Sequence, residues 1–163
     1  MNVLEIPFVK HIGMAYAADG ELLLPSGTCM HNHVGTMHAA ALFALAETQS
    51  GLCLQALFAG DLPPAVLPLL RSSAVKYHTP ANTTVHATAS VSPEEQERFL
   101  ARFERKGRAM ITVTVTLTDD TDTLVMSGEF GWFVQKPAAV EGEAPCAAEE
   151  SPGLLARSLH SFR

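Results

Sequence analysis

The sequence predicts an α+β domain in which one long apolar helix lies among five or six antiparallel β-strands. Three observations support this: an almost uninterrupted apolar run at residues 37–59, a strictly alternating run at residues 108–119, and a capped amphipathic helix between two extended segments. A helix that is apolar on nearly every side needs cover all round, and one small sheet can cover only part of it. The sequence therefore also predicts a second subunit.

The N-terminal part of the chain predicts a β-hairpin. Residues 8–25 are typical of a strand, a turn at Asp19 and Gly20, and a second strand. The apolar helix follows, beginning near Thr36 and running through residues 37–59. A Pro-rich loop at residues 61–68 then leads into the rest of the sheet.

Four extended runs complete the predicted sheet, at residues 69–77, 84–91, 108–119 and 123–135. The third is the clearest, because apolar residues alternate with threonines at the two-residue period of a strand. Its apolar positions are Ile111, Val113, Val115 and Leu117. Residues 119–122 predict the turn that makes the last two strands antiparallel.

A second helix is predicted between the strands at residues 84–91 and 108–119. Ser92 is its N-cap, Pro93 occupies the first helical position, and Glu95 completes a capping box. Gly107 ends the helix. Its apolar stripe consists of Phe99, Leu100 and Phe103.

Length and composition indicate one domain and a tail. A chain of 163 residues can bury a core of its own, and we place this domain at residues 1–136. Residues 137–163 are rich in Ala, Pro and Glu, which is typical of a tail, with one helical turn expected at residues 154–159.

The composition argues against several classes of protein. A net charge of −6 disfavours a broad nucleic-acid surface. The N-terminus has no basic segment followed by an apolar run, so no signal peptide is expected. Cysteines 29, 53 and 146 lack close spacing and predict reduced thiols in a cytoplasmic protein. The long helix is not predicted to span a membrane, because its centre holds Glu47, Thr48, Gln49, Ser50 and Gln55.

Glu47 is the only residue within residues 37–59 that is certain to be charged in water. A carboxylate among Ala and Leu neighbours either lies in a cleft, pairs with a residue from elsewhere, or has a raised pKa. A position in a cleft would indicate a catalytic role for Glu47. The alternative is structural: Glu47 lies on an exposed side with Thr48 and Ser50, or binds a backbone amide across an interface.

The start of the apolar helix is the second candidate for chemistry. Its free backbone N–H groups and the positive end of its dipole favour an oxyanion, and small residues at positions 39–41 keep the entrance open. Ala39 and Glu47 are eight residues apart, or about 12 Å along the helix, so one carbonyl group cannot touch both. Two helices running antiparallel across a two-fold axis would bring the start of one level with the middle of the other. We therefore expect a site shared between two subunits.

The helix start also carries a motif made up of Asn32, Gly35, Thr36, His38, two small residues, Leu42, Leu45, Ala46 and an acid at position 47. This motif resembles that of the hotdog-fold acyl-CoA thioesterases, in particular the phenylacetate-degradation type and the related C-terminal domain of acetyltransferase-like proteins. The order of strands and helices over residues 3–136 is similar to that fold as well. The resemblance implies a hotdog fold, a homodimer or dimer of dimers, and no metal or redox cofactor, with coenzyme A only as part of the substrate.

Residue by residue, the resemblance implies Glu47 as general base or nucleophile, the Ala39 amide as polariser of a thioester carbonyl, and Asn32 as positioner of water or substrate. His38 is expected to line the pocket. Further substrate contacts are expected at Gly35, Thr36, Ala40 and Phe43. Two departures stand out: relatives often have Gly-Gly where this chain has Ala39-Ala40, and an Asp where it has Glu47. We favour activation of water over direct attack by the carboxylate.

Two other groups of residues are candidates for binding, one for phosphates and one for a metal ion. Arg71 and Arg108 are candidates to hold the phosphates of coenzyme A, although basic residues near Arg108 also fit the solvated face of a helix. His31, His33 and His38 have a spacing that could suggest a metal site. No Asp completes that site and Cys29 does so only weakly, so no metal is predicted.

The sequence thus predicts a cytoplasmic thioesterase that hydrolyses an acyl-CoA to a free acid and CoA, with no nucleic-acid or membrane partner. One alternative is a hotdog dehydratase, which would need an Asp/His pair, but the chain has no distinctive Asp-x4-His signature. The other is a non-catalytic acyl-binding module that keeps the fold without turnover.

Overall fold

A computed structural model describes residues 2–58 and 66–136 of the chain. The predicted tail with its helical turn, and most of the Pro-rich loop, lie outside the described residues.

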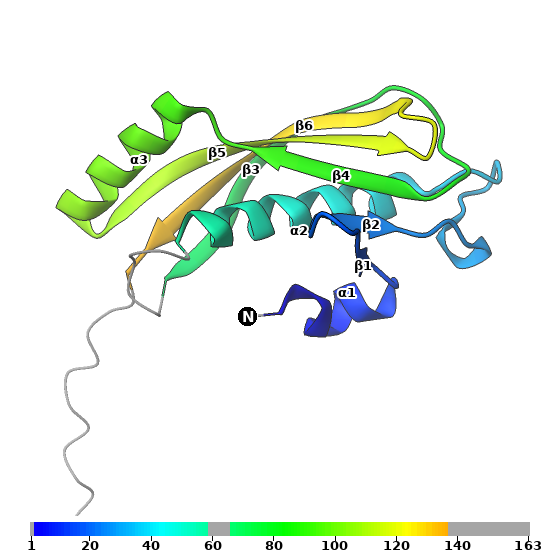
Figure 1. Ribbon diagram of the computed structural model, residues 1–163, viewed down its shortest axis with the longest axis horizontal. Helices are drawn as coiled ribbons and strands as arrows, with labels where there is room; N and C mark the ends of the chain where they lie inside the picture. Colours follow the sequence, from blue (N-terminus) through cyan, green and yellow to red (C-terminus); the bar gives the residue numbers. More distant parts are fainter. Residues whose placement is uncertain (1, 59–65, 137–163) are drawn as a thin grey trace, which may run out of the picture.

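The predicted α+β architecture is confirmed (Figure 1). One antiparallel sheet of six strands has the order β1-β2-β4-β5-β6-β3. Its strands are β1 (Ala15–Tyr16), β2 (Leu22–Leu24), β3 (Leu67–Tyr77), β4 (Val85–Ser90), β5 (Arg108–Asp119) and β6 (Leu124–Gln135). The alternation in β5 places the expected apolar residues in the core and the threonines on the other face. Strand β3 begins at Leu67, so Leu67 and Pro68 belong to the sheet rather than to the predicted loop.

The long helix α2 (Ala39–Leu57) crosses the sheet and packs against β2, β4, β5 and β6 (Figure 1). It begins later than expected from the apolar run, because the His38 backbone is still extended and its ring caps the helix. His38 Nδ1 accepts a hydrogen bond from the Ala40 N–H at 3.0 Å. Ala44, Leu45 and Ala46 are buried in the core on successive sides of the helix. The middle of α2 is thus buried, which agrees with the prediction of a core helix, whereas Ala39 and Ala40 at its start are exposed.

The N-terminal prediction of a strand was wrong for residues 8–11. These residues form a short helix, α1 (Pro7–His11), preceded by a 3₁₀ turn, Val3–Glu5. Pro7 favours the first turn of a helix, and Val9 and Ile12 have the three-residue spacing of one helical face. The hairpin itself is confirmed only for the shorter pair β1 and β2. Figure 1 shows α1 on the side of α2 that faces away from the long strands.

The second helix, α3 (Pro93–Lys106), has the predicted ends. Ser92 Oγ accepts from the Glu95 N–H, and Gly107 adopts a left-handed conformation with φ of 66°. The reciprocal half of the predicted capping box was wrong: the Glu95 carboxylate accepts from the Thr112 N–H at 3.2 Å and from the Arg98 guanidinium rather than from the Ser92 N–H. Strand β4 pairs with β5 only from Thr114 onward. Beyond the end of β4, Glu95 of α3 therefore provides the hydrogen-bond acceptor for the Thr112 N–H of β5.

Candidate active site

Glu47 lies half-buried in the middle of α2. Burial raises the pKa of its carboxyl above the usual value. The nearby Thr48 hydroxyl offsets part of this rise, but its own proton is donated to the Ala44 carbonyl oxygen, 2.8 Å away. Within residues 2–58 and 66–136, no cation forms an ion pair with Glu47. The carboxyl is therefore partly desolvated, and none of the described residues supplies a countercharge.

The exposed-side alternative for Glu47 was wrong. Thr48 and Ser50 are buried, with 8% and 0% of their surfaces exposed. Their hydroxyls bond to carbonyl oxygens of the helix rather than to water: Ser50 Oγ donates to the Glu47 carbonyl oxygen at 2.7 Å. Glu47 is thus the half-buried member of an otherwise buried polar turn.

The loop before α2 is organised by Asn32. The Asn32 side-chain oxygen accepts from the N–H groups of Val34 and Thr36, and its amide donates to the Thr36 hydroxyl at 2.9 Å. Gly35 makes the turn possible with a φ of 80°, a conformation that suits glycine. Asn32 therefore shapes the entrance to the helix, and its role toward water or substrate stays a prediction.

The Ala39 amide has the properties expected of an oxyanion donor. Ala39 is the first residue of α2 and is exposed, and its N–H has no hydrogen-bond partner among the described residues. The His38 ring engages the next amide, that of Ala40, instead. Ala39 and Ala40 have negative φ angles, since Asp122 is the sole non-glycine residue with positive φ in the described part of the chain. Alanines in place of glycines thus cause no backbone strain here.

Tyr77 was not singled out from the sequence. This last residue of β3 donates its hydroxyl hydrogen to the Ala39 carbonyl oxygen at 3.2 Å. Burial raises the pKa of the Tyr77 phenol, which keeps the proton needed for this bond. No local signal could have revealed the contact, because the two residues are 38 positions apart.

The predicted substrate contacts fall into two groups. Ala40 and Phe43 precede Glu47 by seven and four residues, so the three share one face of α2. The Phe43 ring packs on Phe130 of β6, with 5.6 Å between the ring centroids. Ala40 and Phe43 therefore lie on the same face of α2 as Glu47. Ala39 and Glu47 of one subunit are not in contact, because eight residues separate them along the helix.

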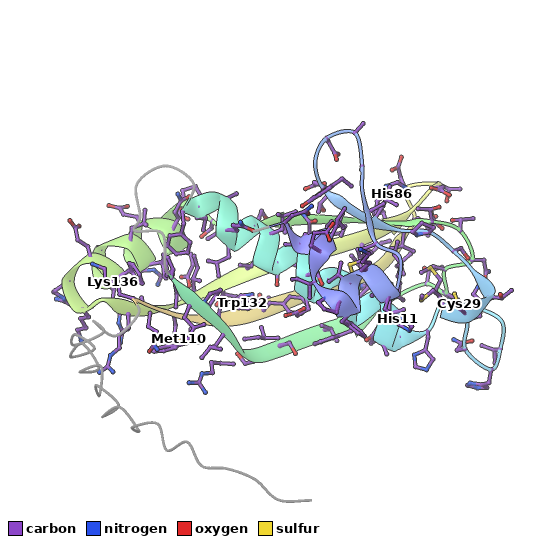
Figure 2. All side chains as sticks on the ribbon, turned by 90° about the horizontal axis from the view of Figure 1, so that it is seen from below. His11, Cys29, His86, Met110, Trp132 and Lys136 are labelled. Carbon is purple, nitrogen blue, oxygen red and sulfur yellow. The ribbon has the colours of Figure 1, made fainter. Side chains whose placement is uncertain are left out.

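Arg71 and Arg108 lie elsewhere. The Arg71 guanidinium lies over the Phe133 ring, 5.4 Å from its centroid. Arg108 lines an open hollow of about 610 Å³ together with Lys106, Gly107, Gln135 and Lys136. Figure 2 places Lys136 at the opposite end of the molecule from Cys29, which lies in the turn Thr28–Met30 before the Asn32 loop. The side chains that line this hollow are basic or amide groups, and the roles of Arg71 and Arg108 toward a substrate stay predictions.

Histidines near the helix start have other partners. His31 Nε2 lies 3.2 Å from the Ser26 hydroxyl, and the His38 ring caps α2. Among residues 2–58 and 66–136, no three His, Cys, Asp or Glu side chains are grouped so that they could hold a metal ion. None of the helices in these segments is long and apolar enough to cross a membrane.

The family is decided by a match over most of the chain: residues 7–134 fit the family model described as a domain of unknown function, DUF4442. The chain belongs to the DUF4442 family. No curated protein sequence matches it. The DUF4442 chain is similar in structure to a Pseudomonas aeruginosa protein of unknown function described as a probable thioesterase. The two are 25% identical with a TM-score of 0.69, over 83% of this chain and 91% of that one.

Two further structures share the fold. A Haemophilus influenzae thioesterase is 17% identical, with a TM-score of 0.64 over 82% of this chain and 86% of that one. A Bacillus halodurans protein whose structure was determined with CoA is 22% identical, with a TM-score of 0.61 over 78% of this chain and 74% of that one. The resemblance to hotdog-fold thioesterases and the predicted fold class are therefore confirmed for this DUF4442 protein.

Proposed function

We propose that this DUF4442 protein is an acyl-CoA thioesterase in which Glu47 of one subunit and the Ala39 amide of its partner act on the same thioester. The observation that carries the proposal concerns α2 within the described part of the chain: Glu47 is half-buried without a countercharge, and the first N–H of the helix has no partner. The likeness to a probable thioesterase and to a protein solved with CoA supports the choice of substrate.

The proposed reaction is hydrolysis. The Ala39 N–H donates to the thioester carbonyl oxygen and stabilises the negative charge that develops there. Glu47 removes a proton from a water molecule, whose oxygen bonds to the carbonyl carbon. The carbon–sulfur bond then breaks, and the leaving sulfur takes the proton that Glu47 removed from water, so that the free acid and the thiol are released and Glu47 is again a carboxylate. A raised carboxyl pKa makes Glu47 a stronger base, which suits proton removal near neutral pH.

The edge strand β3 supports the shared site. It has 11 residues and pairs with β6 on one side, and most of its residues are exposed. A long exposed edge is a template for another strand. Pairing of two β3 strands about a two-fold axis would continue the sheet and set the two α2 helices antiparallel, the arrangement that brings Ala39 and Glu47 together. We therefore propose a homodimer, with a dimer of dimers as a further level of assembly.

Release of free thiol from a panel of aliphatic and aromatic acyl-CoA substrates tests the proposal. Replacement of Glu47 by Gln should leave the fold intact and lower turnover by about 10²–10⁴-fold, the usual contribution of a positioned base. Unchanged turnover in this variant would refute the role of Glu47. Formation of an unsaturated thioester would indicate a dehydratase, and saturable binding without turnover would indicate a binding module.

The mass in solution tests the assembly. A dimer should have twice the 17.4 kDa of one chain, or four times that mass if dimers pair, when measured by light scattering after size exclusion. A monomer that is fully active would refute the shared site, because each subunit alone separates Ala39 from Glu47 along the helix.

A further inference from the structure

A buried chain of hydrogen bonds joins the Glu47 turn of α2 to strand β6. The Trp132 indole N–H donates to Ser50 Oγ at 3.0 Å, and Ser50 Oγ donates to the Glu47 carbonyl oxygen at 2.7 Å. Ser50 is fully buried and Trp132 is 7% exposed. Figure 2 shows Trp132 on β6 in the middle of the molecule. The hydroxyl thus uses both of its roles, as acceptor and as donor, away from water.

The next residue of the helix, Gly51, faces the same indole ring. A Cβ atom built on Gly51 would lie 3.6 Å from two atoms of the Trp132 ring, which is ordinary contact distance. The turn from Glu47 to Gly51 is therefore held by directed hydrogen bonds, and the indole ring lies beside it.

Trp132 links α2 to the edge strand of the sheet, because it bonds to Ser50 of α2 and lies on the strand next to that edge. On β6 it pairs with Leu70 of the neighbouring strand β3, and β3 is the strand that we propose to join the partner subunit. In a site shared between subunits, the position of Glu47 relative to the partner's helix depends on how firmly α2 is fixed to β6 and β3. Apolar contacts around α2 are non-directional and do not by themselves fix its rotation. A directed bond does.

We propose that Trp132 and Ser50 are positioning residues that fix the height and rotation of Glu47 relative to the dimer interface. This inference rests on the proposed function. The two residues touch no substrate; they act through the backbone of the turn that carries the carboxylate. A displacement of about 1 Å at a catalytic group can cost about 10²-fold in rate, so small changes in this turn matter.

Three variants and one control test the inference. Ser50→Ala removes the hydroxyl that links the indole to the Glu47 carbonyl, and Trp132→Phe removes the indole donor. Ser50→Ala alone leaves the buried indole N–H without its partner. The double variant removes the hydroxyl and the indole N–H together, so it avoids this cost. The matched control is Gln49→Met, which removes another buried bond from the same turn. Gln49 Oε1 accepts from the Leu22 N–H at 2.8 Å and anchors α2 to β2 instead of β6.

For Ser50→Ala, we expect kcat to fall about 10–100-fold while KM changes by less than about threefold. The acidic limb of the kcat/KM profile should move to lower pH, because a carboxyl that is free to turn toward water loses part of the burial that raises its pKa. The double variant should keep the low kcat even where its melting temperature exceeds that of Ser50→Ala. The Gln49→Met control should lose stability yet keep the wild-type pH profile.

The inference would be overturned by a Ser50→Ala enzyme with wild-type kcat and pH profile, or by activity that follows melting temperature alone across all four variants. The pKa of Glu47 is also to be measured by carbon NMR on glutamate-labelled protein, with Glu47→Gln to assign the signal. That measurement needs no turnover. If the wild type releases no thiol, the proposed function fails, while a Glu47 pKa that shifts in Ser50→Ala and not in Gln49→Met still supports the positioning.

Discussion

Replacement of Ala39 by Pro would remove the proposed oxyanion donor with little effect on the fold. Ala39 is the first residue of α2, where proline is favoured because the N–H there makes no helical bond. The preceding His38 has φ of −67° and ψ of 135°, the extended conformation that proline requires of the residue before it. The cap from the Ala40 N–H to the His38 ring uses a different amide and is retained. The change therefore deletes one hydrogen-bond donor from an exposed position.

The expected magnitude follows from this geometry. Loss of one oxyanion-hole donor lowers kcat by about 10²–10³-fold, or roughly 2.7–4 kcal/mol of transition-state stabilisation. Stability should not fall and could rise by about 0.4–1 kcal/mol, because proline fits the native backbone and restricts the unfolded chain. Thiol release measures kcat, and thermal unfolding measures stability. Ala39→Gly, which keeps the N–H, should retain at least about tenfold more activity than Ala39→Pro.

Mixed dimers test whether the site is shared. A dimer of one Ala39→Pro subunit and one Glu47→Gln subunit, isolated by two different affinity tags, should have about half of the wild-type kcat, because one of its two shared sites is intact. A dimer of one wild-type subunit and one subunit with both changes should be nearly inactive, because each shared site then lacks one group. If each site lies within one subunit, the two results are reversed. That reversal would refute the reasoning about the antiparallel helices.

Two further predictions concern charge. Because burial raises the pKa of Glu47 in the folded state, the contribution of this carboxyl to stability is present below the usual carboxyl pKa and is lost as pH rises through the raised value. The Glu47→Gln variant should therefore unfold at a higher denaturant concentration than wild type at pH 7. An equal advantage of the variant at acidic pH would contradict this. If Arg108 holds a phosphate of CoA, Arg108→Ala should raise KM about three- to tenfold with kcat unchanged, whereas the matched change Arg102→Ala on α3 should leave KM as it is; equal effects of the two would mean that only overall charge matters.

The sequence was informative where the signal is local. The alternation in β5, the caps of α3 at Ser92 and Gly107, and the apolar run of α2 depend on neighbours within a few residues, and all were predicted. The helix at Pro7–His11 was mistaken for a strand because five residues are too few to separate a period of two from one of 3.6.

The support around the candidate site could not be predicted, because it comes from distant segments. Trp132 bonds to Ser50 across 82 positions, and only the sheet register brings them together. Glu95 was predicted to cap its own helix, but β4 does not reach Thr112, and the Glu95 carboxylate accepts from the Thr112 N–H instead. Glu47 could be identified because burying a charge in an apolar helix is costly wherever the chain folds.

The two ends of the sheet are unequal, and this limits how copies of the chain can stack. Strand β3 has 11 residues, whereas β1, on the opposite edge, has two. When two copies pair through β3, the free edges of the joined sheet are the two short β1 strands, and neither is long enough to pair with a further β3. Growth strand by strand ends after one step, so the fold carries built-in protection against fibrillar aggregation.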